Sequence, residues 1–205
     1  MRRGKAVFHT AFPDISEDFS LIDGEMEAKH GLPDPKLRSL SRTALLLALT
    51  IVFQSLRFFI PLPAIASTFF VGALVNACLV VAALLTGRKA AFLIACVTPV
   101  IAYIQQLLPL PVFIVPVAAG NVIYVWLFTQ LAKIGPIVPA IGGAALGKAI
   151  FFYLAFSQLL KFVELPPPLA AGLLFVMGWP QFVTGVLGAV LATWISNRLR
   201  RVKKM

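Results

Sequence analysis

Apolar residues gather in six long runs along this chain of 205 residues, at positions 43–60, 67–85, 90–108, 112–131, 137–160 and 169–195. Each run is close to the length of about 17 to 25 residues that a helix needs to cross roughly 30 Å of hydrocarbon. Short polar or proline-containing connections separate the runs. The pattern predicts an all-α polytopic membrane protein, a bundle of six transmembrane helices within residues 39–197.

The connections between the runs are of two chemical kinds, and the two kinds alternate. Three connections are rich in proline: residues 61–63, 109–111 and 166–168. The other two are short and basic: residues 86–89 and 133–136. Lysine and arginine concentrate in cytoplasmic loops of membrane proteins. We therefore expect the proline-rich loops outside and both termini in the cytoplasm. A topology with one run as a re-entrant loop is the alternative, and it would place the termini on opposite sides. The expected cytoplasmic side carries Lys36, Arg38, Arg42, Arg88, Lys89, Lys133, Arg198, Arg200, Arg201, Lys203 and Lys204.

Composition narrows the class of protein further. Hydrophobic residues make up 60% of the chain and charged residues 13%, against about 25% charged residues in a typical soluble domain. This excludes a soluble enzyme and a disordered chain, and the basic residues lie between apolar runs, which argues against nucleic-acid binding. Seven of the eight acidic residues lie within residues 1–34. We expect residues 1–38 to form a polar cytoplasmic extension with one short helix around residues 15–30, and residues 198–205 a basic cytoplasmic tail.

No pattern in the chain predicts catalysis, a cofactor or a metal site. Residues 142–149 match the spacing of a phosphate-binding loop except that Ala149 stands in place of serine or threonine, but they lie inside an apolar run. Gly143 and Gly147 are better explained as close contacts between helices. Both histidines lie in the polar extension, and Glu164 is the one acid after residue 34. We therefore expect a protein that binds or passes a solute and is not an enzyme.

Residues 42–50, Arg-Thr-Ala-Leu-Leu-Leu-Ala-Leu-Thr, place Ala44 and Ala48 one turn apart on one helix face. This resembles the AxxxA signature in the first helix of the S components of energy-coupling factor (ECF) transporters. The likeness covers residues 38–205 and includes residues 72–77, 115–121 and 179–184. It implies a prokaryotic cell-membrane protein that captures a small water-soluble vitamin or related nutrient on the outer side.

The resemblance also implies partners. A T component and two cytoplasmic ABC ATPases would supply the energy of import, and Ala44 and Ala48 would contact the T component. The alternative for these two alanines is ordinary packing within the chain.

The resemblance further implies a ligand site among the outer halves of the later helices, under the loop between the first two. Polar side chains within a bilayer are costly and normally face the protein interior or a cavity. On this basis the candidate substrate-binding residues are Arg57, Gln105, Gln106, Asn121, Tyr124, Lys148, Gln158, Trp179 and Gln181.

Each candidate also has a purely structural interpretation. Arg57 either clamps a carboxylate or phosphate or extends its charge to the outer interface. Lys148, in the middle of a run, attracts an anionic ligand, pairs with carbonyl groups or extends toward the cytoplasmic interface. Trp179 either holds a flat heterocycle together with Gln181 or anchors its helix at the membrane surface. Asn76 is predicted to form a hydrogen bond between helices.

The remaining candidates have alternatives of the same kind. Gln105 and Gln106 either form hydrogen bonds with a ligand or cap helix carbonyls. Asn121, one turn from Tyr124, faces either a cavity or a neighbouring backbone.

Two other functions of the protein stay open. A membrane scaffold or assembly protein would pack tightly without an outer cavity, and a self-sufficient carrier would ordinarily show inverted repeats or a water-lined pathway.

Overall fold

The computed structural model describes residues 34–60 and 63–203, and within these ranges the secondary structure is entirely helical. The predicted helix at 15–30 and Pro61 and Leu62 of the first proline-rich loop lie outside the described residues. The elements are α2 (Pro35–Phe59), α3 (Ala64–Leu85), α4 (Arg88–Ile104), the 3-10 turn η1 (Pro111–Phe113), α5 (Ile114–Ile134), α6 (Ile137–Leu159), α7 (Pro167–Val176) and α8 (Trp179–Lys203).

The prediction of an all-helical, multi-pass membrane protein is confirmed in its coarse form. Five stretches in the described part of the chain are long and apolar enough to cross a bilayer: α2, α3, α5, α6 and the stretch that includes α7 and α8. The run at 90–108 forms α4, which has only 17 residues. The run at 169–195 is not one helix, because the backbone leaves helical geometry at Met177 and Gly178. Pro180 lies in the first turn of α8, where a proline's missing N–H costs no helical hydrogen bond.

Local chemistry sets the helix ends. The Asp34 carboxylate accepts a hydrogen bond from the Lys36 backbone N–H at 2.8 Å and caps α2. Gly87, between α3 and α4, has a φ of 105°, a conformation that glycine adopts readily. Pro63, Pro136 and Pro166 each directly precede a helix.

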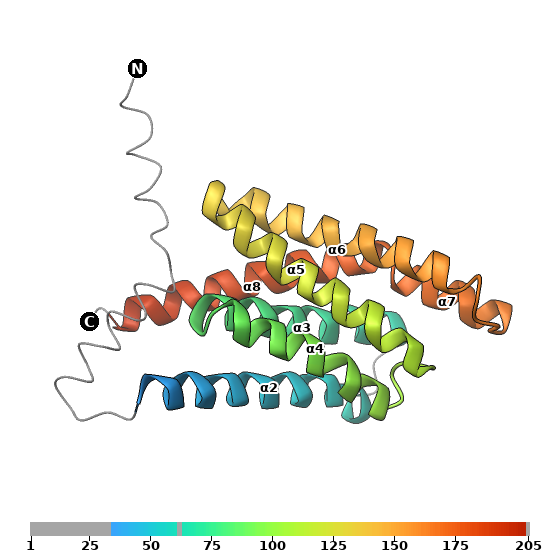
Figure 1. Ribbon diagram of the computed structural model, residues 1–205, viewed down its shortest axis with the longest axis horizontal. Coiled ribbons are helices and arrows are strands. Elements are labelled where there is room, and N and C mark those ends of the chain that lie inside the picture. The colour runs from blue at the N-terminus through green and yellow to red at the C-terminus, as the bar shows by residue number, and fades with distance from the viewer. Residues whose placement is uncertain (1–33, 61–62, 204–205) are drawn as a thin grey trace, which may run out of the picture.

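The chain crosses the bundle back and forth, so the two kinds of connection lie at opposite ends of the bundle (Figure 1). The start of α2, the α3–α4 and α5–α6 connections and the end of α8 lie at one end, which we call the basic end. It carries Arg38, Arg42, Arg88, Lys89, Lys133, Arg198 and Arg201. The opposite end, the proline-rich end, holds the connections around Pro63, Pro109–Pro111 and Pro166–Pro168, with Arg57 and Lys161.

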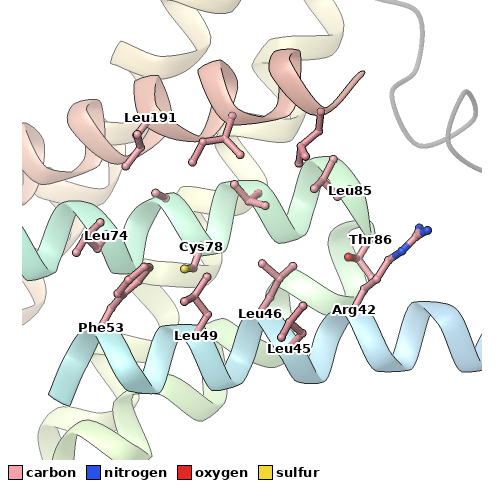
Figure 2. Close-up of a pocket in the computed structure, with 14 residues that line it drawn as sticks. Arg42, Leu45, Leu46, Leu49, Phe53, Leu74, Cys78, Leu85, Thr86 and Leu191 are labelled. Atoms are coloured by element: carbon pink, nitrogen blue, oxygen red, sulfur yellow. The ribbon is translucent and has the colours of Figure 1, made fainter. Parts of the chain in front are cut away.

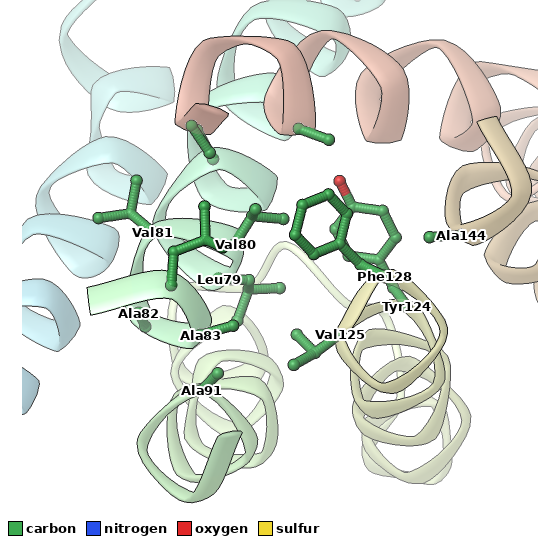
Figure 3. Packing of buried hydrophobic residues seen from close by; sticks show 14 of the residues in the cluster. Leu79, Val80, Val81, Ala82, Ala83, Ala91, Tyr124, Val125, Phe128 and Ala144 are labelled. Carbon is green, nitrogen blue, oxygen red and sulfur yellow. The ribbon is translucent and has the colours of Figure 1, made fainter. Parts of the chain in front are cut away.

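Helix α3 is central and α2 is peripheral. In the apolar stretch of α3, 56% is buried inside the bundle, against 17% in that of α2. Helix α3 makes its most extensive contacts with α8. The main core forms where α3, α4, α5, α6 and α8 meet. Figure 3 shows Tyr124 and Phe128 of α5 pointing between Leu79 and Val80 of α3 and Ala144 of α6.

Small residues let the helices approach closely, as predicted for Gly143 and Gly147. A Cβ atom at Gly143 would lie 2.7 Å from Leu131 Cδ1, and one at Gly147 would meet Leu127, so both glycines pack on α5. Helices α3 and α8 approach closely at Gly188. A Cβ at Gly188 would lie 2.5 Å from Asn76 Cβ and 2.8 Å from the carbonyl oxygen of Ala73. This contact brings Asn76 to the centre of the bundle.

Candidate ligand-binding cavity

A cavity of about 480 Å³ reaches from the proline-rich end into the middle of the bundle. Its size falls within the range of about 300 to 1,000 Å³ that is usual for small-molecule sites. Helices α2 to α8 all contribute lining residues, and α7 provides Pro168, Leu169, Gly172, Leu173 and Val176. The inner part is lined by side chains that are buried, including Thr98, Asn121 and Lys148.

A chain of hydrogen bonds crosses the inner end of the cavity. Lys148 Nζ of α6 donates to Asn76 Oδ1 of α3 at 2.6 Å, and Asn76 Nδ2 donates to Thr184 Oγ1 of α8 at 3.2 Å. The Thr184 hydroxyl donates in turn to the Gln181 carbonyl at 3.2 Å. All three side chains that form these bonds are at most 3% exposed. The chain links three helices and fixes the Lys148 ammonium at the cavity wall.

Aromatic rings complete the surroundings of Lys148. Its Nζ lies 5.1 Å from the ring centroid of Tyr124 and 5.3 Å from that of Phe152, distances at which a ring face attracts a cation. Phe152 also lines the cavity, and its ring fills the space beside Gly120, where any Cβ would clash with it. An amide oxygen and two ring faces therefore surround the amino group of Lys148.

Helix α2 presents two polar side chains to the cavity, Gln54 and Arg57, one turn apart. Gln54 is 6% exposed; its Nε2 lies 3.4 Å from the Thr98 carbonyl, while its Oε1 is buried without a hydrogen-bond partner. Arg57 Nε is likewise buried without a partner. A buried polar atom normally finds a partner, because leaving it unpaired costs about 1 to 3 kcal/mol. Two residues that line the cavity from α2 thus each keep a buried polar atom without a hydrogen-bond partner.

The mouth of the cavity contains an unusual backbone conformation. Gln106, just after α4, has a φ of 58°, and it is the one residue other than glycine with a positive φ among those described. This conformation is costly for most side chains and is found disproportionately at functional sites. It ends α4 and turns the chain toward Leu107, Leu108 and Pro109, which line the cavity beside it.

The structure brings five of the nine predicted candidates together in this cavity: Arg57, Gln106, Asn121, Lys148 and Gln181. Lys148 does not extend toward the membrane surface, because its ammonium is buried against Asn76. Asn76 forms the predicted hydrogen bond between helices and also lines the cavity.

The other four candidates lie outside the cavity lining. Gln105 donates to Ser55 Oγ at 2.9 Å, between α4 and α2, and the buried Tyr124 hydroxyl donates to the Gly185 carbonyl at 2.6 Å. Gln158 is exposed and accepts a hydrogen bond from Lys161 Nζ at 3.0 Å.

Trp179 is 56% exposed and lies against other aromatic rings, with centroids 5.5 Å from Phe69 and 5.8 Å from Phe175. It therefore lies on the outside of the bundle and not in the cavity lining.

Sequence reasoning missed Gln54 and Thr98 as cavity residues. Gln54 precedes Arg57 by three positions, so the two share a helix face, and this spacing was a usable signal. Thr98 precedes Pro99 within α4 and also lines the cavity. A proline inside a helix leaves a carbonyl without its usual donor, which is a feature that often accompanies irregular, functional segments of membrane helices.

A second hollow is a lateral groove of about 670 Å³ between α2, α3 and α8 (Figure 2). Apolar side chains, mainly leucines, line most of it, and Arg42 and Thr86 lie at its basic end. It lacks the convergent polar groups that orient a small ligand. Ala44 and Ala48 lie on the exposed side of α2, next to the groove-lining Leu45 and Leu49. The AxxxA pair is therefore not used to pack α2 against the rest of the described chain.

Comparison of the chain with known protein families, with curated proteins and with solved structures gives no match. Within the described residues, no group of histidine, cysteine, aspartate and glutamate side chains is placed to hold a metal ion.

Proposed function

We propose that this protein is a membrane-embedded substrate-capture subunit that binds a small water-soluble nutrient. The observation that carries the proposal is the cavity at the proline-rich end. In a bundle built of apolar helices, four polar residues line one cavity that opens at the proline-rich end: Gln54, Arg57, Asn121 and Lys148. Polar groups in a membrane helix are expensive, and substrate binding gives these a common purpose. A scaffold protein would have no use for such a space.

In this proposal the cavity opens to the outside of a prokaryotic cell membrane. The basic end then faces the cytoplasm, as the distribution of lysine and arginine favours. Helix α4 crosses the bilayer as a sixth span, because an even number of crossings is needed to keep the ends of the described chain on one side (Figure 1). Its 17 residues are at the lower limit for a span.

We further propose that the protein works as the S component of an ECF-type ABC importer, with a T component and two cytoplasmic ATPases. Ala44 and Ala48 support this because they are exposed on α2, where a partner helix could approach closely. Replacing both with leucine should abolish association with the T component and ATPases of the same organism upon co-expression. Ligand binding should persist, since neither alanine lines the cavity. Unchanged association of the double variant would contradict this part of the proposal.

The test of capture itself is native mass spectrometry of the full chain, purified in detergent without added ligand. We expect one small polar compound bound at a ratio of one per chain and released on denaturation, where it can be identified. Membranes that lack the protein, taken through the same purification, control for carry-over. If no compound is released and no member of a vitamin panel raises the melting temperature, the capture proposal is refuted.

A further inference from the structure

Building on the proposed capture function, we infer that the compound bound in the cavity is a small organic anion, whose carboxylate or phosphate group pairs with the Lys148 ammonium at the inner end. The inference starts from the charge balance of the bundle. Lys148 is 3% exposed and sits at mid-span, where a cation is costly. Buried charges in proteins are normally paired.

No acidic side chain in the described ranges balances this charge. The acids there are Asp34 and Glu164, and neither lines the cavity. Asp34 is exposed at the basic end, where it caps α2, and Glu164 is exposed in the connection between α6 and α7. A protonated Lys148 therefore has no counter-ion among the described residues of its own chain.

The contacts of Lys148 leave donors available. An ammonium group has three protons to donate. Within the described part of the chain it makes one hydrogen bond, to Asn76 Oδ1, and the faces of Tyr124 and Phe152 lie on other sides. Because Asn76 Nδ2 is engaged with Thr184, the amide is oriented with its oxygen toward the lysine. Asn76 is thus a positioning residue that holds Lys148 at the cavity.

A second basic residue lies in the same cavity. Arg57 lines it from α2, and its buried Nε has no hydrogen-bond partner. The neighbouring Gln54 Oε1 is a buried acceptor that is also unpaired. An anion with a polar, hydrogen-bonding body would place its charged oxygens at Lys148 and its remaining polar groups toward the wall that Arg57 and Gln54 line.

The experiment uses the full chain in lipid nanodiscs and three variants. Lys148→Met removes the charge at similar side-chain length. Asn76→Asp supplies an internal carboxylate that competes for the ammonium without changing size. Lys161→Met is the matched control, since Lys161 is exposed and lies outside the cavity lining. The probes are acid and neutral pairs: biotin with biotinamide, nicotinate with nicotinamide, lipoate with lipoamide, and pyridoxal 5′-phosphate with pyridoxal. The compound released from the wild-type protein on denaturation is titrated alongside them.

We expect the released compound to carry a negative charge at pH 7, and any probe that binds to do so only as its charged member. Lys148→Met and Asn76→Asp should each weaken binding about 10- to 150-fold, the range for loss of a hydrogen bond to a charged group. Lys161→Met should bind as the wild type does. Asn76→Asp loses the amide donor to Thr184 and gains an ion pair with Lys148, so its melting temperature is measured beside binding to separate loss of affinity from unfolding.

Two other outcomes overturn the inference in distinguishable ways. If the released compound is neutral or cationic, or if both cavity variants bind the wild-type compound with unchanged affinity, the anion assignment is wrong while capture still stands. If the wild-type protein releases no compound and binds no probe, the capture function fails and the anion site fails with it.

Discussion

Filling the cavity from α7 should weaken ligand binding in proportion to the volume added. Gly172 is the best position for this test. It lines the cavity on the same face of α7 as Pro168 and Val176, and a Cβ built on it meets no other atom within 4 Å. Alanine, leucine and tryptophan at position 172 would therefore extend into open space without displacing a neighbour at the Cβ.

The size of the effect follows from the ligand atoms that each side chain replaces. Alanine adds one non-hydrogen atom, leucine four and tryptophan ten. If each excludes one ligand atom worth about 0.3 kcal/mol, the losses are about 0.3, 1.2 and 3 kcal/mol. These values correspond to about 1.7-fold, 8-fold and 160-fold weaker binding. Stability should not fall, because replacing a glycine within a helix gains up to about 1 kcal/mol.

The assay is isothermal titration of each variant with the compound released from the wild-type protein, together with its occupancy by native mass spectrometry. The same three substitutions at Gly142 serve as controls. A Cβ at Gly142 also meets no atom within 4 Å, but this glycine lies in α6 and lines neither the cavity nor the groove. The Gly142 variants should bind with wild-type affinity.

A graded loss at position 172 with no loss at position 142 would locate the ligand under α7. Equal affinity for the tryptophan variant and the wild type would refute the reasoning, since ten added atoms cannot share the space with a ligand. Equal losses at both positions would also refute it, because they would point to a general effect on the bundle.

Three further outcomes are expected. Gly188→Ala should destabilise the bundle by about 1 to 3 kcal/mol, because its Cβ would lie 2.5 Å from Asn76 Cβ, and an unchanged thermal midpoint in detergent would contradict this. Tyr124→Phe should cost about 1 to 3 kcal/mol by removing the 2.6 Å hydrogen bond to an α8 carbonyl, which reversible denaturation by SDS can measure against the wild type. In a cysteine-free background, a cysteine at Leu110 should react with an impermeant maleimide in intact cells and one at Lys89 only after permeabilisation; the reverse result would exclude the proposed orientation.

The helical architecture was predictable from the sequence because apolar length alone sets it. The run at 137–160 became α6, Ile137–Leu159, and the run at 67–85 became most of α3. The break between α7 and α8 was not predictable in the same way. Met177 and Gly178 lie within a continuous apolar run, and Pro180 fits equally a kinked helix or the first turn of a new one.

The candidate site was harder to predict, because the rotation of each helix decides which side chains face inward. In a soluble helix the polar face reveals this rotation, but a membrane helix is apolar on most sides. Gln158 and Lys148 both lie on α6, yet one faces outward beside Lys161 and the other faces the cavity. Trp179 and Gln181 lie two residues apart on α8. Because of this rotation, Trp179 is exposed and Gln181 lines the cavity.

The shortness of α4 has a consequence for the surrounding lipid. At about 1.5 Å per residue, 17 residues extend roughly 26 Å, whereas the hydrocarbon layer is about 30 Å thick. In the proposed topology, in which α4 crosses the bilayer, the bilayer beside α4 would therefore be locally thinner, or water would reach Gln106 below the level of the headgroups. In both cases the proposed orientation places the mouth of the cavity at a local depression of the membrane surface. The proposed polar ligand would then enter the cavity without crossing the hydrocarbon layer.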